Sequence, residues 1–233
     1  MLLDTVKNVY SRMARAALKA ERDLTGIRLL AVTKGVGPET ISEAVESGLR
    51  EFGESRVQAA REKAAILRES VRDSVLVWHL IGHLQKNKVR PSVELFDLIH
   101  SVDSPELAEL IDTHAGQLGK IQNILLQVKL SDEESKHGFS PDGVLKAAER
   151  VFRLKNLKVA GLMTIPPYFE DPAQVRPFYR ELRLLRDTLI SRGFELRELS
   201  MGMSHDFEVA IEEGATIVRV GTELFGERKK EAA

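Results

Sequence analysis

The segment IQNILLQVKLSDEESKHGFSPDGVLKAAERVFRLKNLKVAGLMTI, residues 121–165, decides the fold of this chain. It begins and ends with apolar runs, at 121–130 and 157–165, that have the length and composition of buried β-strands. Between them, Ser140 and Pro141 form a helix start signal ahead of an amphipathic stretch. Two strands separated by a helical crossover of this length pair in parallel. The segment therefore predicts one β-α-β unit of a parallel sheet.

The same alternation of short apolar runs and helical stretches continues along the whole chain. The runs with strand character are 27–34, 49–54, 75–82, 96–102, 121–130, 157–165, 195–203 and 216–224. Eight such units fit an α/β fold, a single-domain (β/α)8 barrel of the TIM type over residues 1–233. An open doubly wound sheet is the alternative, but the turn after the first run, TKGVGPE, lacks the G-x-G-x-x-G spacing typical of that fold.

A further helix is predicted ahead of the first strand. Its apolar face is expected to carry Leu3, Val6, Tyr10, Met13 and Ala17. The stretch after the last run, FGERKKEAA, is too short for a substantial final helix. We therefore expect the N-terminal helix to cover the seam where the barrel closes.

Composition excludes several classes of protein. Lys and Arg number 34 against 35 Asp and Glu, for a net charge of −1. No excess positive charge is present to attract nucleic acid or an anionic membrane. The absence of cysteine excludes disulfide frameworks, iron–sulfur clusters and thiolate zinc sites. Since no stretch approaches the roughly 18 apolar residues of a membrane-spanning helix, we expect a soluble, cytoplasmic protein. We also expect it to act as a monomer.

Lys34 is the first residue with a chemical role to consider. Functional residues of such barrels lie at the carboxyl ends of the strands, and Lys34 closes the first apolar run on the same face as Leu30 and Val32. A strand-end lysine can pack its stem and extend its head into solvent. It can also be held as a nucleophilic amine for Schiff-base chemistry. The residues alone leave both interpretations open.

The last two runs bring together groups that suit an anionic ligand. Arg219 lies among apolar strand neighbours and needs a partner, either an internal carboxylate or an acceptor atom on a ligand. Gly221 and Thr222 follow it, in a region where such barrels often bind phosphate. Ser204 opens the stretch SHDFEVAIEEG, where it is expected to cap a helix whose N-terminus favours an anion.

A metal site is not predicted. His79 and His83 are four residues apart, but neither Cys nor Glu nearby completes a zinc set. The charged loop SDEESKHGF, residues 131–139, is interpreted as plain surface or as a lid over the site.

Several fragments in order resemble the pyridoxal phosphate homeostasis protein family: AVTK, FGES, WHLIGHLQKNK, ESKHGF, GLMTI, LSMGMSHDFEVAI and VRVGTELFG. The resemblance extends from about residue 27 to 228. It implies a barrel similar to the N-terminal domain of bacterial alanine racemase that binds pyridoxal 5′-phosphate (PLP) without established enzymatic activity.

The same resemblance implies the roles of single residues. Lys34 would be the Schiff-base lysine and Arg219 would face the pyridine nitrogen, with Ser204, Gly221 and Thr222 around the phosphate. Ser55 stands where the family usually has asparagine, in FGEN. Serine is shorter and has one hydroxyl in place of an amide, so a contact to the cofactor there would differ.

The implied function is that of a PLP carrier or reservoir, with apo PLP-dependent enzymes as expected recipients. The alternative is a PLP-dependent amino-acid racemase, which needs a base on each face of its substrate. Alanine racemase takes its second base, a tyrosine, from an additional domain. Here the tyrosines are Tyr10, Tyr168 and Tyr179, of which only Tyr168, in the loop after the sixth run, is a candidate.

Overall fold

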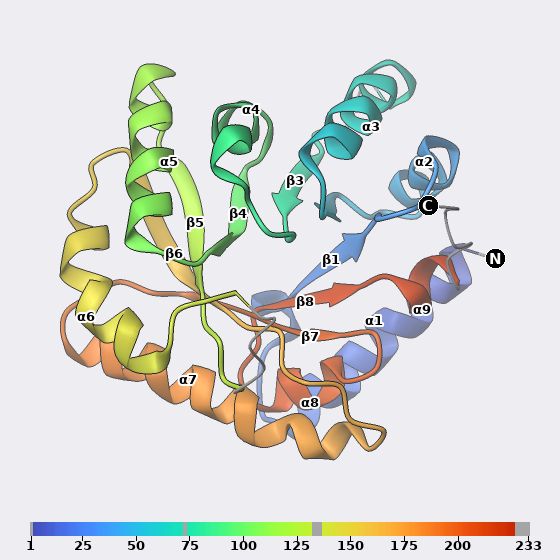
Figure 1. Ribbon diagram of the computed structural model, residues 1–233. Coiled ribbons are helices and arrows are strands. Elements are labelled where there is room, and N and C mark those ends of the chain that lie inside the picture. The colour runs from blue at the N-terminus through green and yellow to red at the C-terminus, as the bar shows by residue number, and fades with distance from the viewer. Residues whose placement is uncertain (1, 72–73, 132–136, 227–233) are drawn as a thin grey trace.

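A computed structural model of the chain describes residues 2–71, 74–131 and 137–226. Eight parallel strands form a closed barrel in which each strand pairs with its neighbours in chain order and β8 pairs with β1 (Figure 1). The strands are β1 (Arg28–Val32), β2 (Glu51–Glu54), β3 (Val77–Leu80), β4 (Leu98–Val102), β5 (Gln122–Gln127), β6 (Leu157–Met163), β7 (Glu198–Met203) and β8 (Ile217–Val220). Each predicted run contains one strand, so the predicted (β/α)8 barrel with a helix before its first strand is confirmed.

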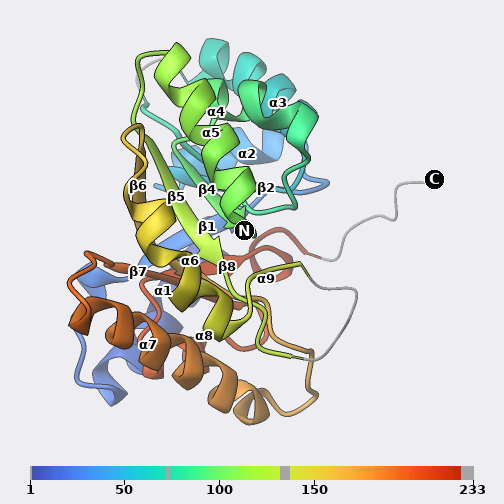
Figure 2. The same cartoon turned by 60° about the vertical axis from the view of Figure 1, so that its left-hand side comes forward.

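Helices surround the barrel, as Figures 1 and 2 show. They are α1 (Leu2–Lys19), α2 (Pro38–Glu46), α3 (Val57–Ser70), α4 (Val89–Leu95), α5 (Pro105–Gln117), α6 (Pro141–Phe152), α7 (Arg176–Ser191), α8 (Phe207–Glu212) and α9 (Thr222–Phe225). The predicted start of α6 is confirmed, because the Ser140 hydroxyl accepts a hydrogen bond from the Gly143 N–H at 3.0 Å. Within the described residues, no helix combines the length and apolar character needed to cross a membrane.

The barrel interior is divided between apolar and polar side chains. Its apolar part consists of Leu30, Leu98, Leu125, Met163 and Ile217. A larger apolar core lies between the strands and the helices. The polar part includes four side chains that are at most 4% exposed: His79, His100, Ser200 and Arg219. Burial of polar groups is costly unless they are hydrogen-bonded, so we expect these side chains to form hydrogen bonds with one another.

Helix α1 packs against α8 and α9, the helices that follow β7 and β8, and so covers the seam as predicted (Figure 1). Its buried face consists of Val6, Val9, Met13, Ala16 and Ala17. The predicted face was wrong in part, because Leu3 and Tyr10 are 46% and 39% exposed. Two overlapping stripes of apolar residues satisfy the helical period, and contact with α8 and α9 selects one of them.

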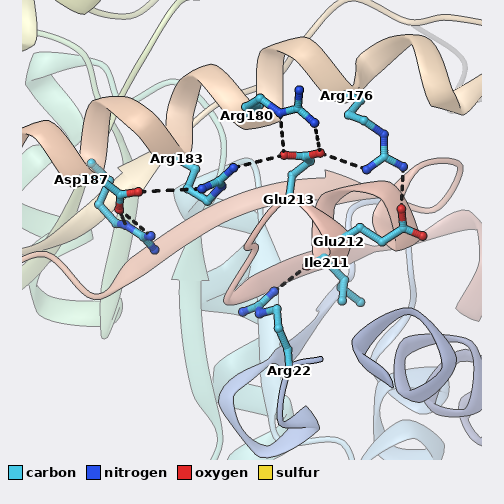
Figure 3. Close-up of polar contacts among 9 residues, drawn as sticks. Arg22, Arg176, Arg180, Arg183, Asp187, Ile211, Glu212 and Glu213 are labelled. Carbon is cyan, nitrogen blue, oxygen red and sulfur yellow. Dashed lines mark hydrogen bonds and ion pairs between the residues drawn. The ribbon is translucent and has the colours of Figure 1, made fainter. Parts of the chain in front are cut away.

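Arginines on α7 hold the end of α8 in place (Figure 3). The Glu213 carboxylate, 4% exposed, accepts hydrogen bonds from Arg176 at 2.9 Å and from Arg180 at 3.1 Å. Arg183 lies 3.6 Å from the same carboxylate, and Arg176 also donates to Glu212 at 2.5 Å. These contacts fix α8, and with it the segment that connects α8 to the end of β7.

The eighth strand is shorter than predicted. The run was expected to continue to residue 224, but β8 ends at Val220 and α9 begins at Thr222. Gly221, with φ −124° and ψ −74°, turns the backbone between them. Apolar Leu224 and Phe225 extended the run in the sequence, but here Leu224 packs inward from a helical turn.

Candidate functional site

Lys34 and Ser55 lie side by side at the carboxyl end of the barrel. The register of β1 and β2 pairs Val32 with Gly53, and each candidate stands two residues beyond its paired position. Both residues border a cleft of about 420 Å³ between the β1–α2 and β2–α3 connections. Lys34 is exposed and Ser55 is half-buried. The structure therefore brings these two predicted residues together.

Glu54, at the end of β2, organises this part of the site. Its carboxylate is 1% exposed and accepts hydrogen bonds from Lys63 Nζ at 2.5 Å, from the Thr33 hydroxyl at 3.0 Å and from the Ser55 N–H at 3.1 Å. Lys63 Nζ also donates to the Thr33 carbonyl at 2.7 Å. Glu54 thus fixes Thr33, the residue before Lys34, and the backbone of Ser55. Lys63 was not predicted as a site residue, because nothing in a helix of mixed charge distinguishes one half-buried lysine from the others.

Gly82 sets the position of Ser55 from the neighbouring strand. A Cβ atom at residue 82 would lie 2.2 Å from the Ser55 carbonyl oxygen, so no side chain fits there. The Gly82 carbonyl in turn accepts a hydrogen bond from the Ser101 hydroxyl at 2.6 Å. In the sequence, the glycine in LIGHL could have indicated this close contact, because glycine at a strand end often marks a place where two backbone segments approach closely.

Arg219 points into the barrel from β8 and has neutral partners. Its Nη1 donates to the Ser200 hydroxyl at 2.7 Å and its Nη2 to the Thr164 carbonyl at 2.9 Å. No carboxylate in the part of the chain that the structure describes forms an ion pair with it, so the internal ion pair considered from the sequence is not formed. Burial lowers the pKa of the Arg219 guanidinium from its ordinary value, but an arginine remains protonated in proteins.

Ser204 and Gly221 meet at the ends of β7 and β8. The Ser204 oxygen accepts a hydrogen bond from the Gly221 N–H at 3.1 Å, and exposed Thr222 follows. The predicted capping role of Ser204 is wrong, because α8 begins at Phe207. The cause is a turn in which the Met203 N–H donates to Asp206 Oδ1 at 2.7 Å and so delays the helix.

This turn depends on Gly202. Its φ of +93° lies in the left-handed region, and a Cβ there would approach the Ala210 Cβ to 2.5 Å. Glycine therefore lets the end of β7 pass close to α8 and directs the following residues, Ser204 among them, toward β8.

The two histidines considered as a metal pair point in different directions. His79 faces His100 in the barrel interior, with 2.9 Å between Nδ1 and Nε2. His83 lies at the mouth, where its ring stacks on His137 at 4.0 Å and its Nδ1 is 3.4 Å from Asp103. One ligand atom from each of His83, Asp103 and His137 lies within 4.8 Å of the others, so the structure brings together a group of possible metal ligands that the sequence did not reveal. Residues 132–136 of the predicted lid loop lie outside the described residues.

The predicted residues thus form two groups on adjacent strands. Lys34 and Ser55 follow β1 and β2, whereas Ser204, Gly221 and Thr222 follow β7 and β8. Because β1 pairs with both β2 and β8, with Ala31 opposite Val220, the two groups share one end of the barrel.

The tyrosines have different environments. Tyr168, in the connection after β6, is 74% exposed, and its ring lies 5.3 Å from that of His205. Tyr179 is buried on α7, which raises the pKa of its hydroxyl. Of these two, only Tyr168 is available to a ligand.

The closed barrel, with a lysine just beyond β1 and an arginine that points inward from β8, defines the class of this protein: it is a barrel of the alanine racemase N-terminal type. The family of the alanine racemase N-terminal domain matches residues 5–229. Within that class, the chain belongs to the pyridoxal phosphate homeostasis proteins. The protein of this name from Aquifex aeolicus is 46% identical over 97% of this chain and 98% of its own length, and that from Homo sapiens is 37% identical over 96% and 85%. PipY of Synechococcus elongatus, solved with PLP bound, is 39% identical with a TM-score of 0.80, over 94% of this chain and all of its own.

Proposed function

We propose that this chain binds PLP at the carboxyl ends of its barrel strands and acts in PLP homeostasis as a carrier or reservoir. The names of its relatives and the PLP-bound structure of PipY support the cofactor. When bound, PLP supplies an aldehyde that reacts reversibly with amines, together with a ring that withdraws electrons.

The observation that carries the proposal is the contrast between two lysines at one cleft. Lys63 Nζ is held by Glu54 and by the Thr33 carbonyl, and it is 13% exposed. Among the described residues, no hydrogen bond or ion pair engages the Lys34 amine. Lys34 is therefore the amine that is free to form a Schiff base with an aldehyde, and Lys63 is the one that shapes its surroundings.

The remaining residues suit the other parts of the cofactor. Ser204 accepts from the Gly221 N–H and so keeps its hydroxyl proton to donate to a phosphate oxygen, beside Thr222. Arg219 uses one N–H toward Ser200 and one toward Thr164, which leaves further donors for the pyridine nitrogen. Ser55 borders the cleft with a shorter side chain than asparagine and would contact the cofactor less directly.

The carrier role is favoured over a racemase because reversible binding needs only an accessible amine and an anion site. Racemisation needs a second base on the opposite face of the substrate. Tyr168 is the residue that keeps this alternative open, since it is exposed in a connection at the same end of the barrel.

The first experiment tests the lysine. The protein is loaded with PLP, reduced with borohydride and mapped by peptide mass spectrometry. A phosphopyridoxyl group is expected on Lys34, and it is expected to be lost in Lys34→Ala but retained in Lys63→Ala. Labelling of Lys63 or Lys129 with Lys34 unmodified would overturn the assignment.

The second experiment tests the role. PLP-loaded protein is incubated with an apo PLP-dependent enzyme, and separately with the common amino acids in both enantiomers. The carrier role predicts stoichiometric reactivation of the apo enzyme, faster than PLP is released spontaneously. Multiple-turnover racemisation that is lost in Lys34→Ala and in Tyr168→Phe would establish the enzyme instead.

A further inference from the structure

A row of polar side chains crosses the barrel interior from β8 to β3. Arg219 Nη1 is 2.7 Å from the Ser200 hydroxyl, which is 2.9 Å from His100 Nδ1. His100 Nε2 is in turn 2.9 Å from His79 Nδ1. Arg219 and Ser200 come from the neighbouring strands β8 and β7, and His100 and His79 come from β4 and β3 on the other side of the barrel (Figure 1). The proposed function assigns a role to Arg219 but none to the other three.

The first link decides the direction of the second. Arginine can only donate hydrogen bonds, so the Ser200 oxygen accepts from Arg219. Among the described residues, the Ser200 hydroxyl has hydrogen bonds with Arg219 and His100 alone. If it also accepted from His100, its own proton would be buried without a partner, which is costly. Ser200 therefore donates to His100 Nδ1.

The direction then passes through both imidazoles. A neutral imidazole has one donor and one acceptor nitrogen, so His100, accepting at Nδ1, carries its proton on Nε2 and donates to His79 Nδ1. His79 must carry its proton on Nε2. That atom is buried without a hydrogen-bond partner, 3.5 Å from Glu51 Oε2. His79 and the starts of several strands border a cavity of about 360 Å³ at the amino-terminal end of the barrel.

We propose that Ser200, His100 and His79 are positioning residues for Arg219, and that their hydrogen bonds run in one direction from Arg219 toward Glu51. Among the described residues, only neutral groups accept hydrogen bonds from the guanidinium, and the Asp206 carboxylate acts on it through space without an ion pair. A carboxylate partner would orient Arg219 equally well but would neutralise it. A guanidinium without a carboxylate bound to it disfavours a proton on the ligand atom that faces it, by like-charge repulsion.

The inference rests on the proposed function only for the identity of the ligand that faces Arg219. The direction of the chain is a property of the protein itself. It can therefore be measured without PLP, and the two claims can fail separately.

The first measurement is imidazole nitrogen NMR on PLP-free protein labelled with 15N-histidine. His79→Gln and His100→Gln identify the two signals. Both rings are expected to carry one proton, on Nε2, at neutral pH. A proton on Nδ1 of either ring, or a doubly protonated ring, would overturn the proposed direction.

The second measurement compares two substitutions of His100. Glutamine can accept from Ser200 through its carbonyl and donate to His79 through its amide, whereas leucine can do neither. His100→Leu is expected to weaken PLP binding about tenfold or more, the effect of losing one good hydrogen bond, and to shift the absorption maximum of the bound cofactor. His100→Gln is expected to restore both the affinity and the spectrum.

Ser200→Ala breaks the same chain with a smaller change in volume and serves if His100→Leu does not fold. If Ser200→Ala and His100→Leu both bound PLP with the affinity and spectrum of the unsubstituted protein, the positioning role would be refuted. If the unsubstituted protein did not bind PLP, the proposed function would fail, and the histidine tautomers would still decide the direction of the chain.

Discussion

Acidification is expected to destabilise this barrel through two histidines in its interior. His79 and His100 are 1% and 0% exposed. Burial, with a smaller contribution from the positive charge of Arg28, lowers the pKa of His79 to about 3. Burial also lowers the pKa of His100 well below 6.5, with smaller contributions from a protonated His79, from Arg219 and from Arg28. Both side chains are therefore neutral in the native state near neutral pH.

The sign follows from the unfolded state, in which both histidines titrate near the ordinary value of 6.5. Below that pH the unfolded chain binds two protons that the native barrel does not bind, so stability falls as the pH falls. Above 6.5 neither state binds them and the effect vanishes. At about pH 4.5, two units below 6.5, His79 alone costs about 3 kcal/mol, and His100 adds to this cost in the same direction.

Urea unfolding at a series of pH values, followed by circular dichroism, measures this dependence. Carboxylates contribute to the slope as well, so the informative quantity is a difference between proteins. The double variant His79→Gln/His100→Gln is expected to lose up to about two protons of uptake on unfolding between pH 5 and 6, or at most about 3 kcal/mol per pH unit. An unchanged slope in the double variant would refute the assignment of two neutral buried imidazoles.

Three further outcomes are expected. Ser204→Ala should weaken PLP binding by about 1.5–3 kcal/mol, as for a hydrogen bond to a charged group, and leave pyridoxal binding unchanged; titration of both ligands checks this. Gly202→Ala and Gly193→Ala share nearly the same φ, +93° and +92°, but only the first meets an atom at 2.5 Å, so its thermal midpoint should fall further; equal midpoints would contradict the packing argument. Burial would raise the pKa of Glu213, but the hydrogen bonds from the arginines outweigh burial and lower it. The ionised carboxylate therefore adds stability above pH 4.5, and this stability is lost as the pH falls below that value. Glu213→Gln should remove this contribution. Denaturation at pH 7 and pH 3.5 should show a loss of about 1.5–3 kcal/mol at the higher pH and a smaller one at the lower.

The order of elements could be predicted because it depends on local patterns. Apolar runs of strand length, and start signals such as Ser140 ahead of Pro141, each arise within one segment of chain. The errors lie where one local pattern permits two outcomes. Tyr10 fits a helical stripe as well as Val9 does, and only the packing of α1 on α8 and α9 distinguishes them. Ser204 has the sequence context of a helix cap, but Asp206 takes the nearby N–H and the helix starts later.

What the sequence by itself determined is the barrel, with Lys34 just beyond its first strand and Arg219 on its last. Tertiary structure alone decided the partners of these residues. Glu54 meets Lys63 across 9 positions of the sequence, Ser204 meets Gly221 across 17, and His100 meets Ser200 across 100. Such pairs depend on strand register and on closure of β8 against β1, which place distant residues within hydrogen-bond distance. Propensity and periodicity act over a few residues, so they place a side chain on a face without specifying which atom it meets there.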